Sequence, residues 1–112
     1  MALPTINQLG ETFGAEVIGL DLREQVDAGV IETLNQALLD NIVLVIRGQD
    51  LTAQEFRDGM ANFGEPMLQH RANFRLPECP DVSRIVNREN MRPAAMWHTD
   101  HTNHERPPKA TI

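Results

Sequence analysis

The sequence predicts an α+β fold, and three observations support this class. A short stretch, Val17–Leu22, carries apolar side chains at every second position. Two segments with the apolar spacing of helices follow, Ala28–Asn41 and about Thr52–Asn62, and the apolar run Ile42–Ile46 separates them. The remainder is rich in proline and short extended pieces. The predicted order is strand, helix, strand, helix and then mostly strands, within one domain spanning residues 1–112.

The two N-terminal strands are predicted from different patterns. In Val17–Leu22, the side chains of Ile18, Leu20 and Leu22 share one face, because alternate residues of a strand point to the same side. Ile42–Ile46 is continuously apolar and mostly β-branched, which indicates a strand buried on both faces.

Both predicted helices begin at recognisable caps. Asp27 precedes Ala28–Asn41 and provides an oxygen for its free backbone N–H groups. Thr52 and Glu55 have the spacing of a capping box, and Gly64 is expected to end that helix. The apolar residues expected to face the core are Val30, Ile31, Leu34, Ala37 and Leu38 in the first helix, and Ala53, Phe56, Met60 and Phe63 in and after the second.

The C-terminal part predicts a loop-rich stretch followed by short strands. The loop covers residues 65–80, and the expected strands are Ser83–Asn87, Ala95–Thr99 and an extended piece at Lys109–Ile112. Because the last piece has the composition of a strand opening, we expect a truncated chain without its partner strands. Unpaired edges and apolar surface would then favour self-association.

Composition excludes some classes of partner. The chain has 16 acidic and 10 basic side chains, so its net charge of -6 disfavours binding to nucleic acid. The run Ile42–Ile46 is far too short to cross a membrane, and the N-terminus lacks a secretory signal. The single Cys79 cannot form an internal disulfide. These features predict a cytoplasmic protein.

The candidate site lies in Trp97–His104, which contains several metal-capable side chains. On a strand, His98 and Asp100 would share one face while His101 would point away. One imidazole and one carboxylate form two-thirds of the 2-His-1-carboxylate set that binds non-haem Fe(II). Two alternatives remain open. One is a loop with a surface histidine and a capping aspartate, and the other is a metal held by His98, His101 and His104.

Several stretches resemble the TauD/TfdA family of Fe(II)- and 2-oxoglutarate-dependent dioxygenases. Residues 96–102 (MWHTDHT), followed by 107–112 (PPKATI), resemble the first metal-binding motif of that family. Residues 41–52 (NIVLVIRGQDLT), followed by 63–66 (FGEP), resemble its N-terminal strand, turn and helix, and residues 14–22 (GAEVIGLDL) resemble its opening. The resemblance covers most of the chain in the order of the family.

The resemblance implies a fold and a reaction. The fold would be the N-terminal part of a double-stranded β-helix, or jelly roll, with flanking helices. The reaction would couple oxidative decarboxylation of 2-oxoglutarate, with O₂, to hydroxylation of a small organic substrate. His98 and Asp100 would be Fe(II) ligands, and Trp97 would pack beside the metal strand or fill the core. His70 lies near the position of a sulfonate-binding histidine in that family.

The remaining parts of such a site are expected beyond Ile112. They are a second histidine ligand and an arginine that pairs with 2-oxoglutarate. We therefore expect the 112-residue chain alone to be inactive and its parent protein to be a dioxygenase. Two other functions compete with this interpretation. One is a non-catalytic metal- or partner-binding module derived from the same fold, and the other is a zinc hydrolase that uses the histidine cluster.

Overall fold

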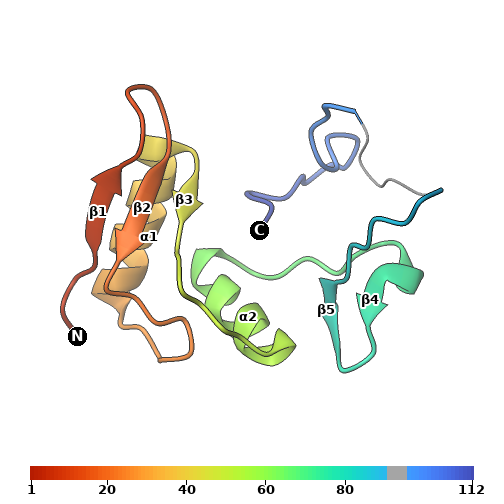
Figure 1. Cartoon of the computed structure of the whole chain (residues 1–112), viewed down its shortest axis with the longest axis horizontal. Helices are drawn as coiled ribbons and strands as arrows, with labels where there is room; N and C mark the ends of the chain where they lie inside the picture. Colours follow the sequence, from red (N-terminus) through yellow and green to blue (C-terminus); the bar gives the residue numbers. More distant parts are fainter. Residues whose placement is uncertain (91–95) are drawn as a thin grey trace. The chain divides into compact units, whose positions relative to one another are not determined.

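The structure is a computed structural model that describes residues 1–90 and 96–112 (Figure 1). The chain forms two compact units, an N-terminal unit of Met1–Phe63 and a C-terminal unit of Gly64–Ile112. In the described ranges, no helix has both the length and the apolar character needed to span a membrane.

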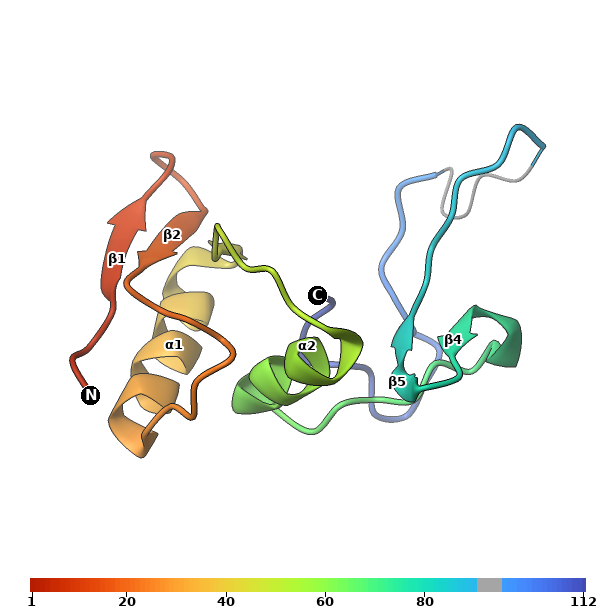
Figure 2. The same ribbon diagram turned by 60° about the horizontal axis from the view of Figure 1, so that its bottom comes forward.

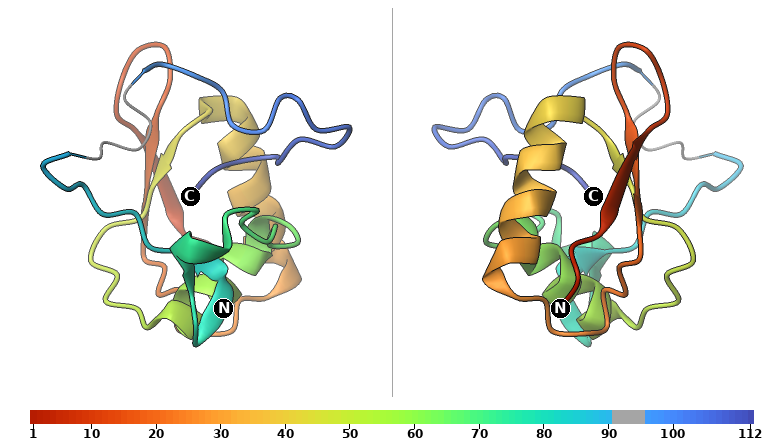
Figure 3. Two further views of the ribbon diagram at one scale, coloured as in Figure 1. Left: turned by 90° about the vertical axis from the view of Figure 1, so that its right-hand side faces the viewer. Right: turned by 90° about the vertical axis from the view of Figure 1, so that its left-hand side faces the viewer.

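The N-terminal unit is built on a three-stranded sheet with the order β1-β2-β3. β1 (Thr5–Gln8) pairs antiparallel with β2 (Ala15–Ile18), and β2 pairs in parallel with β3 (Leu44–Val45). A parallel pair needs a crossover connection, which helix α1 (Ala28–Asn41) provides. Figure 3 shows α1 lying along one face of this sheet.

Helix α1 has the predicted bounds, and its predicted cap is confirmed. Asp27 accepts a hydrogen bond from the backbone N–H of Val30 at 3.0 Å. Val30, Leu34 and Ala37 are buried, as the helical spacing predicted. The core of the unit consists of buried side chains from the sheet side, from α1 and from the end of the second helix, namely Val17, Leu20, Leu22, Val26, Val30, Leu34 and Phe63.

The first predicted strand is shifted, and its three apolar residues Ile18, Leu20 and Leu22 do not share one face. β2 ends at Ile18, which is 47% exposed, while Val17 is buried. Gly19 follows with a φ of 85°, a left-handed conformation that glycine adopts readily. This residue breaks the alternation, so Leu20 and Leu22 are buried although Ile18 is not.

The prediction that Ile42–Ile46 forms a strand buried on both faces is also wrong. Ile42 is 71% exposed and has a φ of 69°, and only Leu44 and Val45 join the sheet. The N–H of Ile42 donates to Leu38 and that of Val43 donates to Asn41, both at 2.8 Å. The second bond closes a three-residue γ-turn, which ends α1 abruptly and points Ile42 outward.

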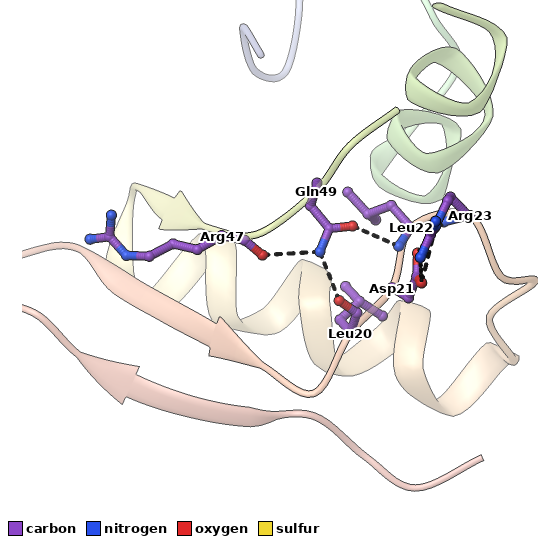
Figure 4. Close-up of polar contacts among 6 residues, drawn as sticks. All are labelled: Leu20, Asp21, Leu22, Arg23, Arg47 and Gln49. Carbon is purple, nitrogen blue, oxygen red and sulfur yellow. Dashed lines mark hydrogen bonds and ion pairs between the residues drawn. The ribbon is translucent and has the colours of Figure 1, made fainter. Parts of the chain in front are cut away.

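A glutamine side chain fixes the segment between β2 and α1. The Nε2 of Gln49 donates to the carbonyls of Leu20 (3.0 Å) and Arg47 (3.1 Å), and its Oε1 accepts from the N–H of Leu22 at 2.9 Å (Figure 4). These bonds satisfy backbone groups that lie outside the sheet ladders. They hold the buried Leu20 and Leu22 in place against the core.

The second helix, α2 (Ala53–Met60), begins with the predicted capping box. Thr52 and Glu55 exchange side-chain to backbone hydrogen bonds of 2.8 and 3.3 Å. A 3₁₀ turn, η1 (Ala61–Phe63), extends the helix to the buried Phe63, and Gly64 follows at a φ of 151°. The other predicted core residues of this helix, Ala53, Phe56 and Met60, are only half-buried.

The C-terminal unit contains a small hairpin, seen in Figure 2, that the sequence did not predict. The 3₁₀ turn η2 (Ala72–Phe74) leads into β4 (Arg75–Leu76), which pairs antiparallel with β5 (Cys79–Ser83). Pro77 supplies the turn, and Pro80 is accommodated because a two-stranded sheet has only edge strands. The prediction treated both prolines as loop residues.

The two strands predicted in this unit are wrong. Ser83–Asn87 overlaps β5 only at Ser83, and no strand is present at residues 96–99. The extended piece expected at Lys109–Ile112 is not assigned to a strand either. Ala95, the first residue of the strand predicted at Ala95–Thr99, lies outside the described residues. Turns and bends occupy residues 100–106 instead.

Candidate metal centre

His98 and Asp100 meet in an irregular segment of the C-terminal unit. The Nε2 of His98 lies 3.0 Å from Oδ1 of Asp100, and the two side chains are 49% and 39% exposed. The convergence that the sequence predicted is therefore present, although the strand invoked to explain it is absent. A local bend and turn bring the two groups together.

Each of the two side chains has a further partner that limits how it can turn. The Nδ1 of His98 lies 2.7 Å from the backbone carbonyl of Met96. Because a carbonyl only accepts, Nδ1 carries the proton in this contact. The hydroxyl of Thr111 donates to Oδ2 of Asp100 at 2.7 Å. Nε2 of the ring and Oδ1 of the carboxylate are consequently the atoms left facing each other.

The same contacts shift the pKa of both groups. The pKa of His98 is raised, first by the hydrogen bond to the Met96 carbonyl and then by the carboxylate of Asp100. The pKa of Asp100 is lowered, first by the hydroxyl of Thr111 and then by His98. Both ring nitrogens of His98 thus lie beside acceptor oxygens. A metal at Nε2 would take the place that Asp100 occupies opposite this nitrogen.

The donor set fits a divalent transition metal. Bonds of about 2.1 Å at right angles would place two donor atoms about 3.0 Å apart, which is the separation of Nε2 and Oδ1. Imidazole nitrogen with carboxylate oxygen suits Fe(II), Mn(II) or Zn(II). Within residues 1–90 and 96–112, however, no group of three His, Cys, Asp or Glu side chains is arranged to hold a metal.

The other histidines gather in a separate cluster. The ring centroid of His101 lies 5.2 Å from that of His70 and 4.9 Å from that of His104, and both ring pairs meet edge-on. His101 has a φ of 52°, a left-handed conformation in which histidine is enriched, and the N–H of His104 donates to its carbonyl at 3.0 Å. His101 nevertheless stays close enough to Asp100 to contribute, after Thr111 and His98, to the lowered pKa of that carboxyl. The alternative ligand set of His98, His101 and His104 is not assembled here.

The sequence pattern does not indicate two partners of the His98–Asp100 pair. The Met96 carbonyl is a backbone group, and Thr111 is eleven residues from Asp100, so neither has a motif. Pro107 and Pro108, which lie between Asp100 and Thr111, were the available signal that the chain is irregular there. Trp97 was expected beside a metal strand or in the core, yet it is fully exposed. His70 lies beside His101.

A family model described as "Taurine catabolism dioxygenase TauD, TfdA family" matches residues 5–112. A relative from Pseudomonas putida, named alpha-ketoglutarate-dependent sulfate ester dioxygenase, is 29% identical over 110 residues. That match covers 96% of this chain and 35% of the relative. The chain thus spans about a third of the length of this relative.

Two solved structures are also similar. A taurine dioxygenase from Burkholderia xenovorans superposes with a TM-score of 0.81 at 33% identity, covering 96% of this chain and 38% of that one. AAD-2, in complex with Mn(II) and N-oxalylglycine, gives a TM-score of 0.56 at 32% identity, covering 59% and 24%. Since the family model matches nearly the whole chain, the protein belongs to the taurine catabolism dioxygenase TauD, TfdA family.

Proposed function

We propose that His98 and Asp100 are two of the three protein ligands of an Fe(II) centre in a 2-oxoglutarate-dependent dioxygenase. The observation that carries this proposal is the 3.0 Å approach of Nε2 to Oδ1. The outward nitrogen of the ring and the second carboxylate oxygen are both engaged elsewhere. Bound Fe(II) would supply activation of O₂, which oxidises the substrate while 2-oxoglutarate is decarboxylated.

The chain would contribute the N-terminal part of a jelly-roll enzyme. The match to 35% of the relative named as a sulfate ester dioxygenase supports this view. A third ligand, a histidine, and an arginine for 2-oxoglutarate would come from a longer parent polypeptide. The Mn(II) and N-oxalylglycine bound to AAD-2 support a divalent metal and a small acid as the groups this family accommodates.

The substrate we propose is a small organic sulfate ester or sulfonate. Relatives named for a sulfate ester and for taurine support this class. His70 is the proposed substrate-binding residue, because its ring contacts His101, the residue directly after Asp100. An imidazole N–H there would donate to an anionic oxygen of the substrate.

The test uses a polypeptide extended by the downstream coding sequence to the length of its relatives. Decarboxylation of 2-oxoglutarate is measured with Fe(II), O₂ and either an alkyl sulfate ester or taurine. We expect turnover with one of them, loss of turnover in His98→Ala and Asp100→Ala, and a raised KM for the sulfur compound in His70→Ala. His104→Ala is the matched control and should retain activity. Absence of turnover in the extended protein would favour a non-catalytic module.

A further inference from the structure

Thr111 contacts Asp100 from eleven residues further along the chain. Its hydroxyl donates to Oδ2 at 2.7 Å, while Oδ1 lies 3.0 Å from Nε2 of His98. A hydroxyl bonded to an ionised carboxylate at this length is a charge-assisted hydrogen bond, stronger than one between neutral groups. The two carboxylate oxygens therefore have different partners: Oδ1 faces His98, and Oδ2 accepts from Thr111.

Packing does not fix the carboxylate of Asp100. The side chain is 39% exposed, and the terminal torsion of aspartate is broad and roughly two-fold. Without an outside partner, either oxygen would turn toward His98, and the group would sample intermediate orientations. The hydroxyl of Thr111 removes this freedom by occupying Oδ2.

The chain between Asp100 and Thr111 folds so that the Thr111 hydroxyl reaches the Asp100 carboxylate. The turn from His101 to His104 reverses the chain soon after Asp100. Pro107 and Pro108 then fix two φ angles on the return, which reduces the entropy lost when the segment closes. Threonine is β-branched with few χ1 rotamers, so its hydroxyl is already restricted in direction.

The opposite side of the pair is held in the same way. The Met96 carbonyl accepts from Nδ1 of His98 at 2.7 Å and so keeps Nε2 directed at Asp100. Metal sites generally hold each ligand by such an outer partner, and loss of one typically weakens metal binding about 10–100-fold. Both candidate ligands here have one.

We propose that Thr111 is a positioning residue for the metal centre, where its hydroxyl presents Oδ1 of Asp100 beside Nε2 of His98. The inference rests on the proposed function, since it presumes that this pair binds a metal. Thr111 itself is not a ligand in this account. It acts through the orientation of Asp100.

The test is a titration of the full 112-residue chain with Mn(II) alone, followed by the fluorescence of Trp97, the single tryptophan, which adjoins His98. Thr111→Val keeps the shape and removes the hydroxyl, and we expect binding about tenfold weaker than that of the wild type. Thr111→Ser retains the hydroxyl and should bind within about twofold of the wild type. Thr102→Val, which leaves the Thr111–Asp100 bond in place, is the matched control and should bind as the wild type does.

Thr111→Ala is a second variant without the hydroxyl and should show the same loss as Thr111→Val. The inference is overturned if both bind as tightly as the wild type, or if Thr111→Ser loses as much as they do. Asp100→Ala and His98→Ala distinguish a failure of metal binding by the pair from a failure of the role of Thr111. If they bind Mn(II) as the wild type does, the metal pair itself is wrong. If they abolish binding while Thr111→Val and Thr111→Ala do not weaken it, only the role of Thr111 is wrong.

Discussion

The two units of this chain are ordered by different forces. Among the described residues, every buried apolar side chain except Cys79 belongs to the N-terminal unit. Its helix, sheet and connecting segments share one core around Val30 and Leu34. The C-terminal unit has a short hairpin, and its candidate site is held by side-chain hydrogen bonds and ring contacts between exposed groups. Stability and candidate chemistry therefore lie in different parts of the sequence.

The largest effect is expected from the core of the N-terminal unit. Leu34→Ala removes a fully buried side chain from α1 and leaves a cavity, which should cost about 3 kcal/mol in the free energy of unfolding. Leu39→Ala, an exposed position on the same helix, is the matched control and should change it by less than about 0.5 kcal/mol. Urea unfolding followed by circular dichroism measures both. Equal losses at the two positions would contradict the assignment of the core.

A smaller loss is expected when Gln49 is replaced. Gln49→Ala leaves the Leu22 N–H and the Leu20 carbonyl without their partner, at a cost of about 2 kcal/mol. Gln36→Ala removes an exposed hydrogen bond to Asp40 within α1 and should cost only a few tenths of a kcal/mol. The same urea assay compares the free energies of unfolding of the two variants. No change in Gln49→Ala would show that water replaces the lost bonds.

Asp27 should make the N-terminal unit sensitive to acid. Its pKa is lowered below the ordinary value of 3.8, first by the hydrogen bond from the Val30 N–H. A lowered folded pKa means that its stabilisation is complete above 3.8 and is lost as the pH falls through the folded value. Asp27→Asn keeps a capping oxygen and does not titrate. The midpoint of urea unfolding of Asp27→Asn should therefore fall less in acid than that of the wild type. Equal falls would refute the role of this cap.

The smallest effect on stability is expected at the candidate site itself. His98→Ala removes a half-exposed side chain and should change the free energy of unfolding by less than about 0.5 kcal/mol. Differential scanning calorimetry on the same samples used for metal titration provides the comparison. A loss similar to that of Leu34→Ala would mean that the pair is structural.

Sequence reasoning predicted best where local chemistry decides the outcome. Helix α1 and both helix caps followed from spacing and from oxygen-bearing side chains at Asp27 and Thr52. It did less well where one backbone angle resets a pattern. The positive φ of Gly19 breaks the alternation, so that Ile18 is exposed while Leu20 and Leu22 are buried. The positive φ of Ile42 likewise leaves the start of the apolar run Ile42–Ile46 exposed. Periodicity carries no information about such angles.

The approach of His98 to Asp100 was predicted from the sequence, but the groups that hold the two side chains were not. The spacing of His98 and Asp100 identified the pair, although the supposed strand is a bend. The Met96 carbonyl and the Thr111 hydroxyl depend on where the chain returns, which no local pattern encodes. The ring contacts of His101 with His70 and His104 likewise depend on the turn at His101.

The central claim is that His98 binds metal through Nε2 together with Asp100. Long-range ¹H–¹⁵N NMR of the four imidazole rings measures this directly when Zn(II), a diamagnetic stand-in for Fe(II), is added at mildly alkaline pH. The account predicts that the Nε2 resonance of His98 shifts, that its Nδ1 keeps the proton donated to Met96, and that Asp100→Ala abolishes the shift. Shifts at His101 and His104, with His98 unchanged, would contradict it.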